Sequence, residues 1–257
     1  MMTDTSLIEV LVMALVIGAA SGSIGAFIVL KRMALVGDAL SHVALPGIAL
    51  ALAYGIDPLF GVVVFLLAAA VIIWWLERKT KLSTDALVGL LFTASLAIGV
   101  LTIPNHEIIE SLFGAFPSLE PAIFTIIIAV GVLMTMFSYL LAPRFLFGII
   151  SPELAKVQGV GERFNFALLI IFVLVVALGI KLVGTLLMGA LTIIPAAIAR
   201  NITKSLRSYM IVSTLLGSLL SAGGVLIAKY FGILPGPTII LVGIALFIAS
   251  LFWVRKK

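Results

Sequence analysis

Two ionisable side chains stand four residues apart in an otherwise apolar stretch of the chain. Asp38 and His42 have the spacing that places both on one face of a helix. An aspartate inside a membrane costs about 2.5–3.5 kcal/mol, and such residues usually line a pathway or pair with each other. A carboxylate with an imidazole suits divalent ions such as Mn²⁺, Zn²⁺ and Fe²⁺ better than Cu⁺ or Ca²⁺. A metal site, an ion pair within one helix, and a carboxylate near the headgroups after Arg32 all remain open.

A proline and a glycine follow this pair directly. Pro46 has no backbone N–H, so the carbonyl of His42, four residues earlier, loses its usual helical hydrogen bond. The Pro46–Gly47 step therefore predicts an interruption of the helix beside the two ionisable residues.

The second histidine of the chain stands near two acidic residues. His106, Glu107 and Glu110 approach the His-Glu-x-x-His pattern of zinc proteases, but the second histidine is missing. The first interpretation is a solvated loop, and the second is an outer mouth that attracts cations. The chain has no Walker A sequence, so we expect it to hydrolyse no nucleotide and to be no enzyme.

The composition shows what surrounds these residues. Of 257 residues, 63% are hydrophobic and 11% are charged, and the mean hydropathy is +1.35. Soluble domains average roughly 45–50% apolar and about 25% charged residues, so a soluble fold is excluded. The net charge of +5 is typical of basic cytoplasmic loops rather than of nucleic-acid binding. The absence of cysteine excludes disulfides and thiolate metal sites.

Apolar runs of about 20 residues predict an all-α, multi-pass membrane protein with about eight or nine transmembrane helices. Placing the basic clusters in the cytoplasm leaves only Lys181 and Lys229 outside, which predicts an external N-terminus and a cytoplasmic C-terminus. No soluble domain fits, so residues 1–257 are expected to form one transmembrane domain. The predicted spans are about 6–30, 33–53, 59–76, 85–103, 121–141, 164–183, 184–199, 208–229 and 237–254.

The longest polar connection, about residues 143–163, is long enough for one or two short helices. Ser151 and Pro152 form a favourable helix start, Glu153 suits the positive end of the dipole, and Gly159 is a natural stop. A helix of two turns is too short to be stable alone. It is expected to dock either on its own bundle or on a cytoplasmic partner.

Small residues are dense in the first span, from Gly18 to Ala26. Such residues let neighbouring helices approach closely, so we predict a helix–helix contact there. Asp57, directly before Pro58, is explained by turn and capping chemistry.

Several stretches together resemble the membrane permease of metal-cation ABC importers, the zinc, manganese and iron uptake group. The resemblance covers nearly the whole chain and is most specific over residues 30–47. Further matching stretches are 111–114, 152–160, 183–200 and 234–238. The chain departs from the family pattern at Ser151, where an acidic residue is common, and at Met188–Gly189, a departure that concerns packing.

The resemblance implies a metal-type ABC permease fold in the cytoplasmic (inner) membrane of a prokaryote. It implies a second copy of this chain, a cytoplasmic ATPase dimer and an external metal-binding protein as partners, with no permanently bound cofactor. Asp38 and His42 match the residues that coordinate the transported metal. The matching coupling helix, which contacts the ATPase, contains Pro152, Glu153, Leu154, Ala155, Lys156 and Gly159.

Two other transport functions remain as alternatives. A permease for a chelate such as cobalamin or a siderophore has a related architecture, but such cargo carries its own ligands. A secondary metal transporter usually shows two related halves, and the sequence contains no convincing repeat.

Overall fold

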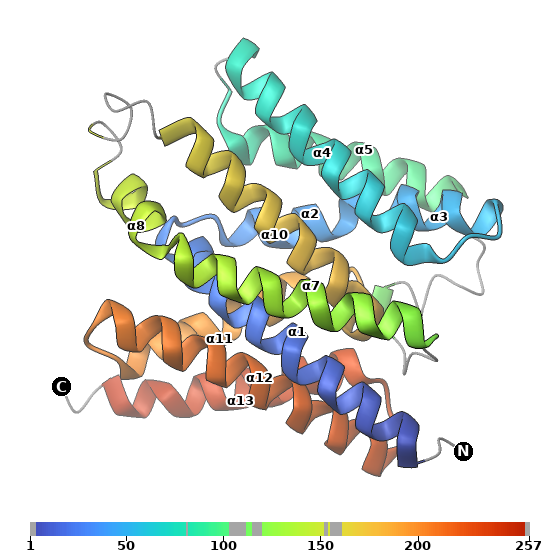
Figure 1. Ribbon diagram of the computed structural model, residues 1–257, viewed down its shortest axis with the longest axis vertical. Coiled ribbons are helices and arrows are strands. Elements are labelled where there is room, and N and C mark those ends of the chain that lie inside the picture. The colour runs from blue at the N-terminus through green and yellow to red at the C-terminus, as the bar shows by residue number, and fades with distance from the viewer. Residues whose placement is uncertain are drawn as a thin grey trace.

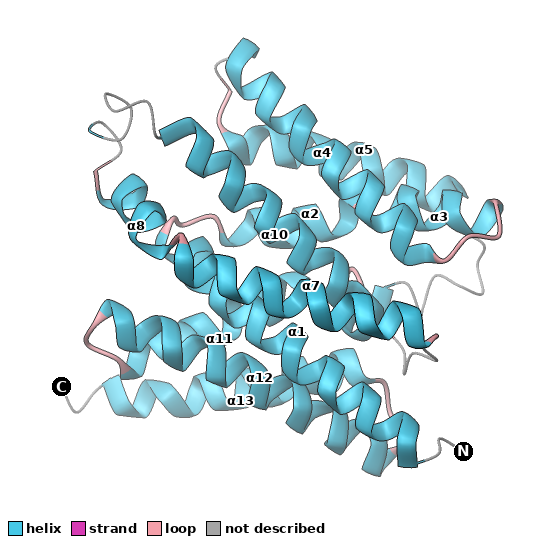
Figure 2. Ribbon diagram, in the orientation of Figure 1, coloured by secondary structure: helices cyan, strands magenta, loops and turns pink. Residues whose placement is uncertain are grey.

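The computed structural model describes residues 4–80, 82–102, 112–114, 120–151, 154 and 161–254. In these ranges all the regular elements are helices and none is a strand (Figure 2). The all-α prediction is therefore confirmed.

Figure 1 shows the helices of these ranges, coloured from blue near the N-terminus to red near the C-terminus. Their bounds are α1 Asp4–Leu30, α2 Ala34–Val43, α3 Leu45–Ala53, α4 Pro58–Thr80, α5 Thr84–Thr102, α7 Pro121–Leu140, α8 Ala142–Ile150, α10 Gly161–Val183, α11 Met188–Ile202, α12 Leu206–Phe231 and α13 Pro235–Val254.

Seven candidate spans among the described residues are long and apolar enough to cross a membrane, and α2 with α3 counts as one of them. Two shorter apolar helices, Thr84–Gly99 and Met188–Ile202, occupy the remaining predicted positions. Figure 1 places the start of α1 and the end of α13 at opposite ends of the bundle. An odd number of crossings requires that arrangement. Which end faces the cytoplasm stays a prediction.

Helix α1 runs through the middle of the bundle and contacts α7, α10, α11 and α12. A Cβ atom at Gly18 would overlap the carbonyl oxygen of Gly217, so α1 and α12 pack backbone against backbone. The hydroxyl of Ser213 donates a hydrogen bond of 2.6 Å to the carbonyl of Gly22. The predicted close contact at the small residues of the first span is thus confirmed.

Two helix boundaries differ from the sequence expectation or refine it. Helix α11 begins at Met188 rather than near Gly184, because Gly184 has a φ of +84°, a left-handed conformation that ends α10. Within the polar connection, α8 occupies Ala142–Ile150 and ends before Ser151. At least one of the expected short helices is therefore present.

Candidate functional site

The two ionisable residues of the second span lie on α2, a ten-residue helix that ends at Val43. The backbone N–H of Ala44 donates to the Ser41 carbonyl at 3.4 Å, and Ile48 N–H donates to the Ala44 carbonyl at 3.0 Å. Pro46 lies in the first turn of α3. The predicted interruption is present, and it falls at Ala44, two residues before the proline.

The other end of α2 is also irregular. Arg32 has a φ of 60°, the left-handed region that residues other than glycine, asparagine and aspartate seldom adopt. Among the described residues other than glycine, it alone has a positive φ. Helix α2 is therefore a short segment with a left-handed residue before it and an interruption of the helical hydrogen bonding after it.

Asp38 and His42 have different surroundings on this segment. Asp38 is exposed on the single chain, whereas His42 is only 5% exposed. The Phe92 ring of α5 meets the imidazole edge to face, with 5.2 Å between ring centroids. No ion pair joins Asp38 and His42 in the described structure, so the alternative of a pair within one helix is not found.

The Nδ1 atom of His42 is buried and has no hydrogen-bond partner. Leaving such a group unpaired costs about 1–3 kcal/mol, and an unsatisfied polar atom is a reason to look for a functional role. An imidazole nitrogen without a protein partner is available to a ligand if α2 moves enough to uncover it.

Helix α11 packs directly against the backbone of Asp38. A Cβ atom at Gly189 would lie 2.7 Å from the Asp38 Cα and 2.8 Å from its backbone N. On the preceding residue of α2, a Cβ at Gly37 would lie 3.1 Å from the ring of Phe172 on α10. The glycine at 189, a departure from the family pattern, thus allows α11 to contact the Asp38 backbone directly.

Gly47 serves packing in a way that the Pro46–Gly47 pattern did not indicate. A Cβ atom there would overlap the Gly61 carbonyl oxygen and lie 3.0 Å from the Cβ of Phe65, both on α4. Helices α3 and α4 therefore approach closely through two facing glycines. This contact holds α3, the second part of the interrupted span, in place.

A turn between α3 and α4 carries an ion pair that sequence analysis missed. Asp57 accepts a hydrogen bond from Leu59 N–H at 2.8 Å, which confirms its capping role. Its other carboxylate oxygen lies 2.7 Å from Lys181 Nζ at the end of α10. The two residues are 124 positions apart, so no local pattern could reveal the pair.

Three stretches that carry the family resemblance meet at the same end of α10. Leu186 N–H donates to the Leu112 carbonyl at 3.0 Å. A Cβ at Gly236 would overlap the carbonyl oxygens of Phe113 and Val183. Residues far apart in sequence thus form one backbone junction, which a pattern read along the chain cannot predict.

Several predicted site residues lie outside the described residues: His106, Glu107 and Glu110 of the outer loop, and Pro152, Glu153, Ala155, Lys156 and Gly159 of the coupling segment. Leu154 is described, and its side chain is 58% exposed. The described residues contain no cluster of three or more His, Asp or Glu side chains suited to hold a metal ion. Within the described part of one copy, any metal site would therefore have fewer than three such ligands.

Sequence comparison relates this chain to known proteins. The model of the ABC 3 transport family matches residues 3–254. The manganese import system permease protein ScaB of Streptococcus gordonii is 32% identical over 252 residues, which cover 96% of this chain and 91% of that protein. The high-affinity zinc uptake system membrane protein ZnuB of Haemophilus influenzae is 31% identical, with 96% and 97% covered.

Solved structures agree with the sequence relatives. PsaBC from Streptococcus pneumoniae in complex with Fab superposes with a TM-score of 0.84 at 31% identity, covering 97% of this chain and 93% of that one. An inward-facing putative metal-chelate type ABC transporter has a TM-score of 0.79 at 17% identity and shares the fold. The helices and the fold thus define a multi-pass membrane protein with the architecture of an ABC permease. The chain belongs to the ABC 3 transport family.

Proposed function

We propose that this chain is the permease of an ABC importer that moves a divalent transition metal, Mn²⁺, Zn²⁺ or Fe²⁺, into the cytoplasm. A separate ATPase dimer in the cytoplasm drives transport, and an external metal-binding protein delivers the ion. The permease lies in the cytoplasmic membrane of a prokaryote, with its N-terminus outside and its C-terminus inside.

The observation that carries the proposal is the exposed carboxylate of Asp38 one helical turn from His42, on a segment with a joint at each end. An exposed carboxylate inside a predicted membrane span needs either a cation, a proton or a partner protein. Oxygen and nitrogen donors together suit the proposed metals. Relatives above 30% identity, named for manganese and for zinc transport, support the same substrate class.

Two copies of the chain would complete the site. A twofold axis beside α2 brings two carboxylates and two imidazoles together, which gives four ligands for a tetrahedral or an open octahedral ion. Facing carboxylates repel each other, so an empty site favours capture of a cation or a proton. Four ligands from two separate chains can also part when the copies move, which lets the ion leave.

Three divalent ions fit the proposed class of substrate. Mn²⁺, Zn²⁺ and Fe²⁺ accept similar nitrogen and oxygen ligands, and selection among them depends on geometry and supply. The relatives named for manganese and zinc favour these two ions as the first to be tested.

Substitution of the two ligands tests the site. Asp38→Ala and His42→Ala should each abolish metal-dependent growth and initial Mn²⁺ and Zn²⁺ uptake, although both proteins reach the membrane in normal amount. Ser41→Ala is the matched control: its buried hydroxyl donates only to the Gly37 carbonyl within α2, so uptake should remain near the wild-type rate. Wild-type uptake by the Asp38→Ala, His42→Ala double variant would refute the assignment.

The same uptake assay separates the alternative functions. A chelate permease would lose uptake of a supplied chelate only slightly in the two variants, because the cargo brings its own ligands. A secondary transporter would keep uptake when the partner ATPase is deleted, whereas the proposed importer would lose it.

Contact with the ATPase is tested at residue 155. If residues 152–160 form the coupling helix, Ala155→Asp should uncouple ATP hydrolysis from transport and leave membrane insertion normal. Unchanged metal uptake would instead favour a role for this segment in packing of the bundle.

A further inference from the structure

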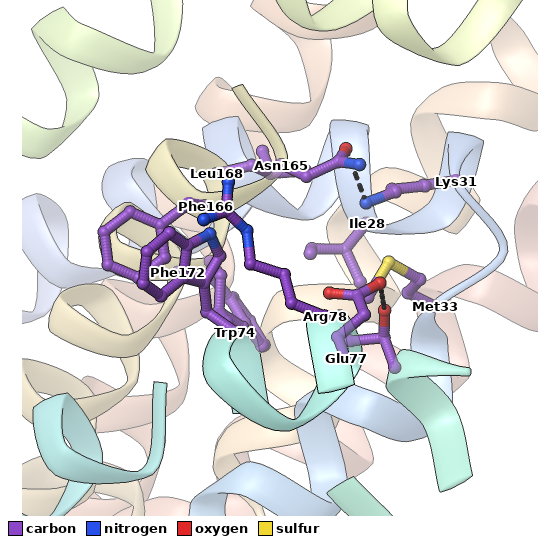
Figure 3. A pocket seen from close by; sticks show the side chains of 12 residues that line it. Ile28, Lys31, Met33, Trp74, Glu77, Arg78, Asn165, Phe166, Leu168 and Phe172 are labelled. Carbon is purple, nitrogen blue, oxygen red and sulfur yellow. Dashed lines mark hydrogen bonds between the residues drawn. The ribbon is translucent and has the colours of Figure 1, made fainter. Parts of the chain in front are cut away.

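The joint between α1 and α2 is tied to a distant helix by one side chain. Lys31, directly after α1, donates a hydrogen bond of 3.0 Å from Nζ to the Oδ1 of Asn165 on α10 (Figure 3). The two residues are 134 positions apart, and Asn165 lies in the first two turns of α10. Helix α10 follows directly on the segment for which the sequence predicts contact with the ATPase.

Beside this hydrogen bond lies a cavity of about 230 Å³. Its lining includes Lys31, Met33, Trp74, Glu77, Asn165 and Phe172. Met33 is the last residue before α2, and Phe172 is the ring that contacts Gly37. The α1–α2 joint therefore borders an open space and has room to move.

A carboxylate, that of Glu77 on α4, lines the same cavity as Lys31. Burial lowers the pKa of the Lys31 ammonium group, while the carboxylates of Glu77 and Asp85 raise it. Glu77 now accepts a hydrogen bond of 2.9 Å from the Thr84 hydroxyl (Figure 3). Arg78 is engaged with the Trp74 ring, 4.3 Å from its centroid. Lys31 thus lines the same cavity as an amide on α10 and a carboxylate on α4.

We propose that Lys31 is a positioning residue for Asp38 and His42: its ammonium group alternates between Asn165 on α10 and the carboxylate of Glu77 on α4, and this choice sets the position of α2. The inference rests on the proposed transport function. In the present arrangement Lys31 holds the joint to α10, and Phe172 contacts α2 beside Asp38.

Three features make α2 suited to such control. Arg32 carries the left-handed backbone directly after Lys31, so a small torsional change there redirects the whole of α2. At the other end of α2, the helical hydrogen bonding is interrupted at Ala44, two residues before Pro46. His42 Nδ1 is buried without a partner in the present position, so a tilt that uncovers it satisfies that atom with a ligand.

Uptake kinetics of cells that carry the complete transporter test the inference. Lys31→Met removes the ammonium group and with it the contact to either partner. It should lower the maximal Mn²⁺ uptake rate about tenfold, at an unchanged half-saturating concentration and an unchanged amount of permease in the membrane. Lys31→Arg retains a cation and should restore most of the rate. Lys229→Met is the matched control, because this lysine lies near the end of α12 and outside the cavity, and it should behave as wild type.

A double-mutant cycle separates a switch from a merely structural contact. Glu77→Gln removes the alternative partner and should slow uptake severalfold when Lys31 is present, but should have no further effect in Lys31→Met. Wild-type kinetics of Lys31→Met, or full multiplication of the two effects, would overturn the inference. If Asp38→Ala and His42→Ala abolish uptake in that same experiment, the proposed function stands and only the role of Lys31 fails.

Discussion

Gly189→Ala places a methyl group directly against the backbone that carries Asp38. The new Cβ would lie 2.7 Å from the Asp38 Cα, 2.8 Å from its N and 3.0 Å from its Cβ. Ordinary van der Waals contact begins near 3.4 Å, so α2 must move away from α11 by about 0.7 Å. Two of the three overlapped atoms belong to the backbone, and rotation of a side chain cannot relieve the overlap.

We expect the Gly189→Ala variant to fold with Asp38 displaced from its wild-type position. Overpacking of a tight contact costs about 1–3 kcal/mol. Alanine is about 1 kcal/mol more favourable than glycine inside a helix, which offsets part of that cost. The net loss of stability is then about 0–2 kcal/mol. If the displaced ligands raise the transport barrier by about 1–2 kcal/mol, uptake slows roughly 5–30-fold.

The measurement is the initial Mn²⁺ or Zn²⁺ uptake rate per molecule of permease in the membrane. Gly223→Ala is the matched control on α12, because no atom lies within 4 Å of its new Cβ. Gly18→Ala overlaps the Gly217 carbonyl instead, so it should lower stability at the α1–α12 contact, away from α2. Wild-type uptake by Gly189→Ala, or an equal loss in Gly223→Ala, would refute the reasoning.

Other consequences follow from single contacts. Asp57→Asn keeps the acceptor for Leu59 N–H but loses the ion pair, so detergent melts should show less than about 1 kcal/mol of destabilisation; Asp57→Ala should lose about 1 kcal/mol more. Tyr209→Phe removes the hydroxyl that donates to the Ala26 carbonyl at 3.2 Å, which should lower the free energy of unfolding by about 1 kcal/mol. A reporter enzyme fused after Lys257 should be active on the cytoplasmic side, and external activity would contradict the predicted orientation.

The local features of this protein follow from neighbouring residues in the chain. Nine apolar stretches predicted the spans because a helix in lipid must satisfy its own backbone and present apolar side chains over about 20 residues. Pro46 predicted the break after α2 because the missing N–H acts within one turn. Asp57 predicted a capped turn because its side chain can accept a hydrogen bond from a backbone N–H two residues later. Asp38 and His42 stood out because ionisable side chains are rare in membrane spans.

The pairing of the helices and the surroundings of the chemical groups depend on contacts between distant parts of the chain. The contacts of Gly189 with Asp38, Phe92 with His42, and Lys31 with Asn165 join residues from different helices. The boundary of α11 also depended on the conformation of Gly184, where the backbone has a positive φ. Hydropathy cannot predict such pairings, because lipid tails are as apolar as a leucine side chain and do not drive one face of a helix inward. Close packing and a few polar contacts choose the partners, and both depend on residues that the sequence separates.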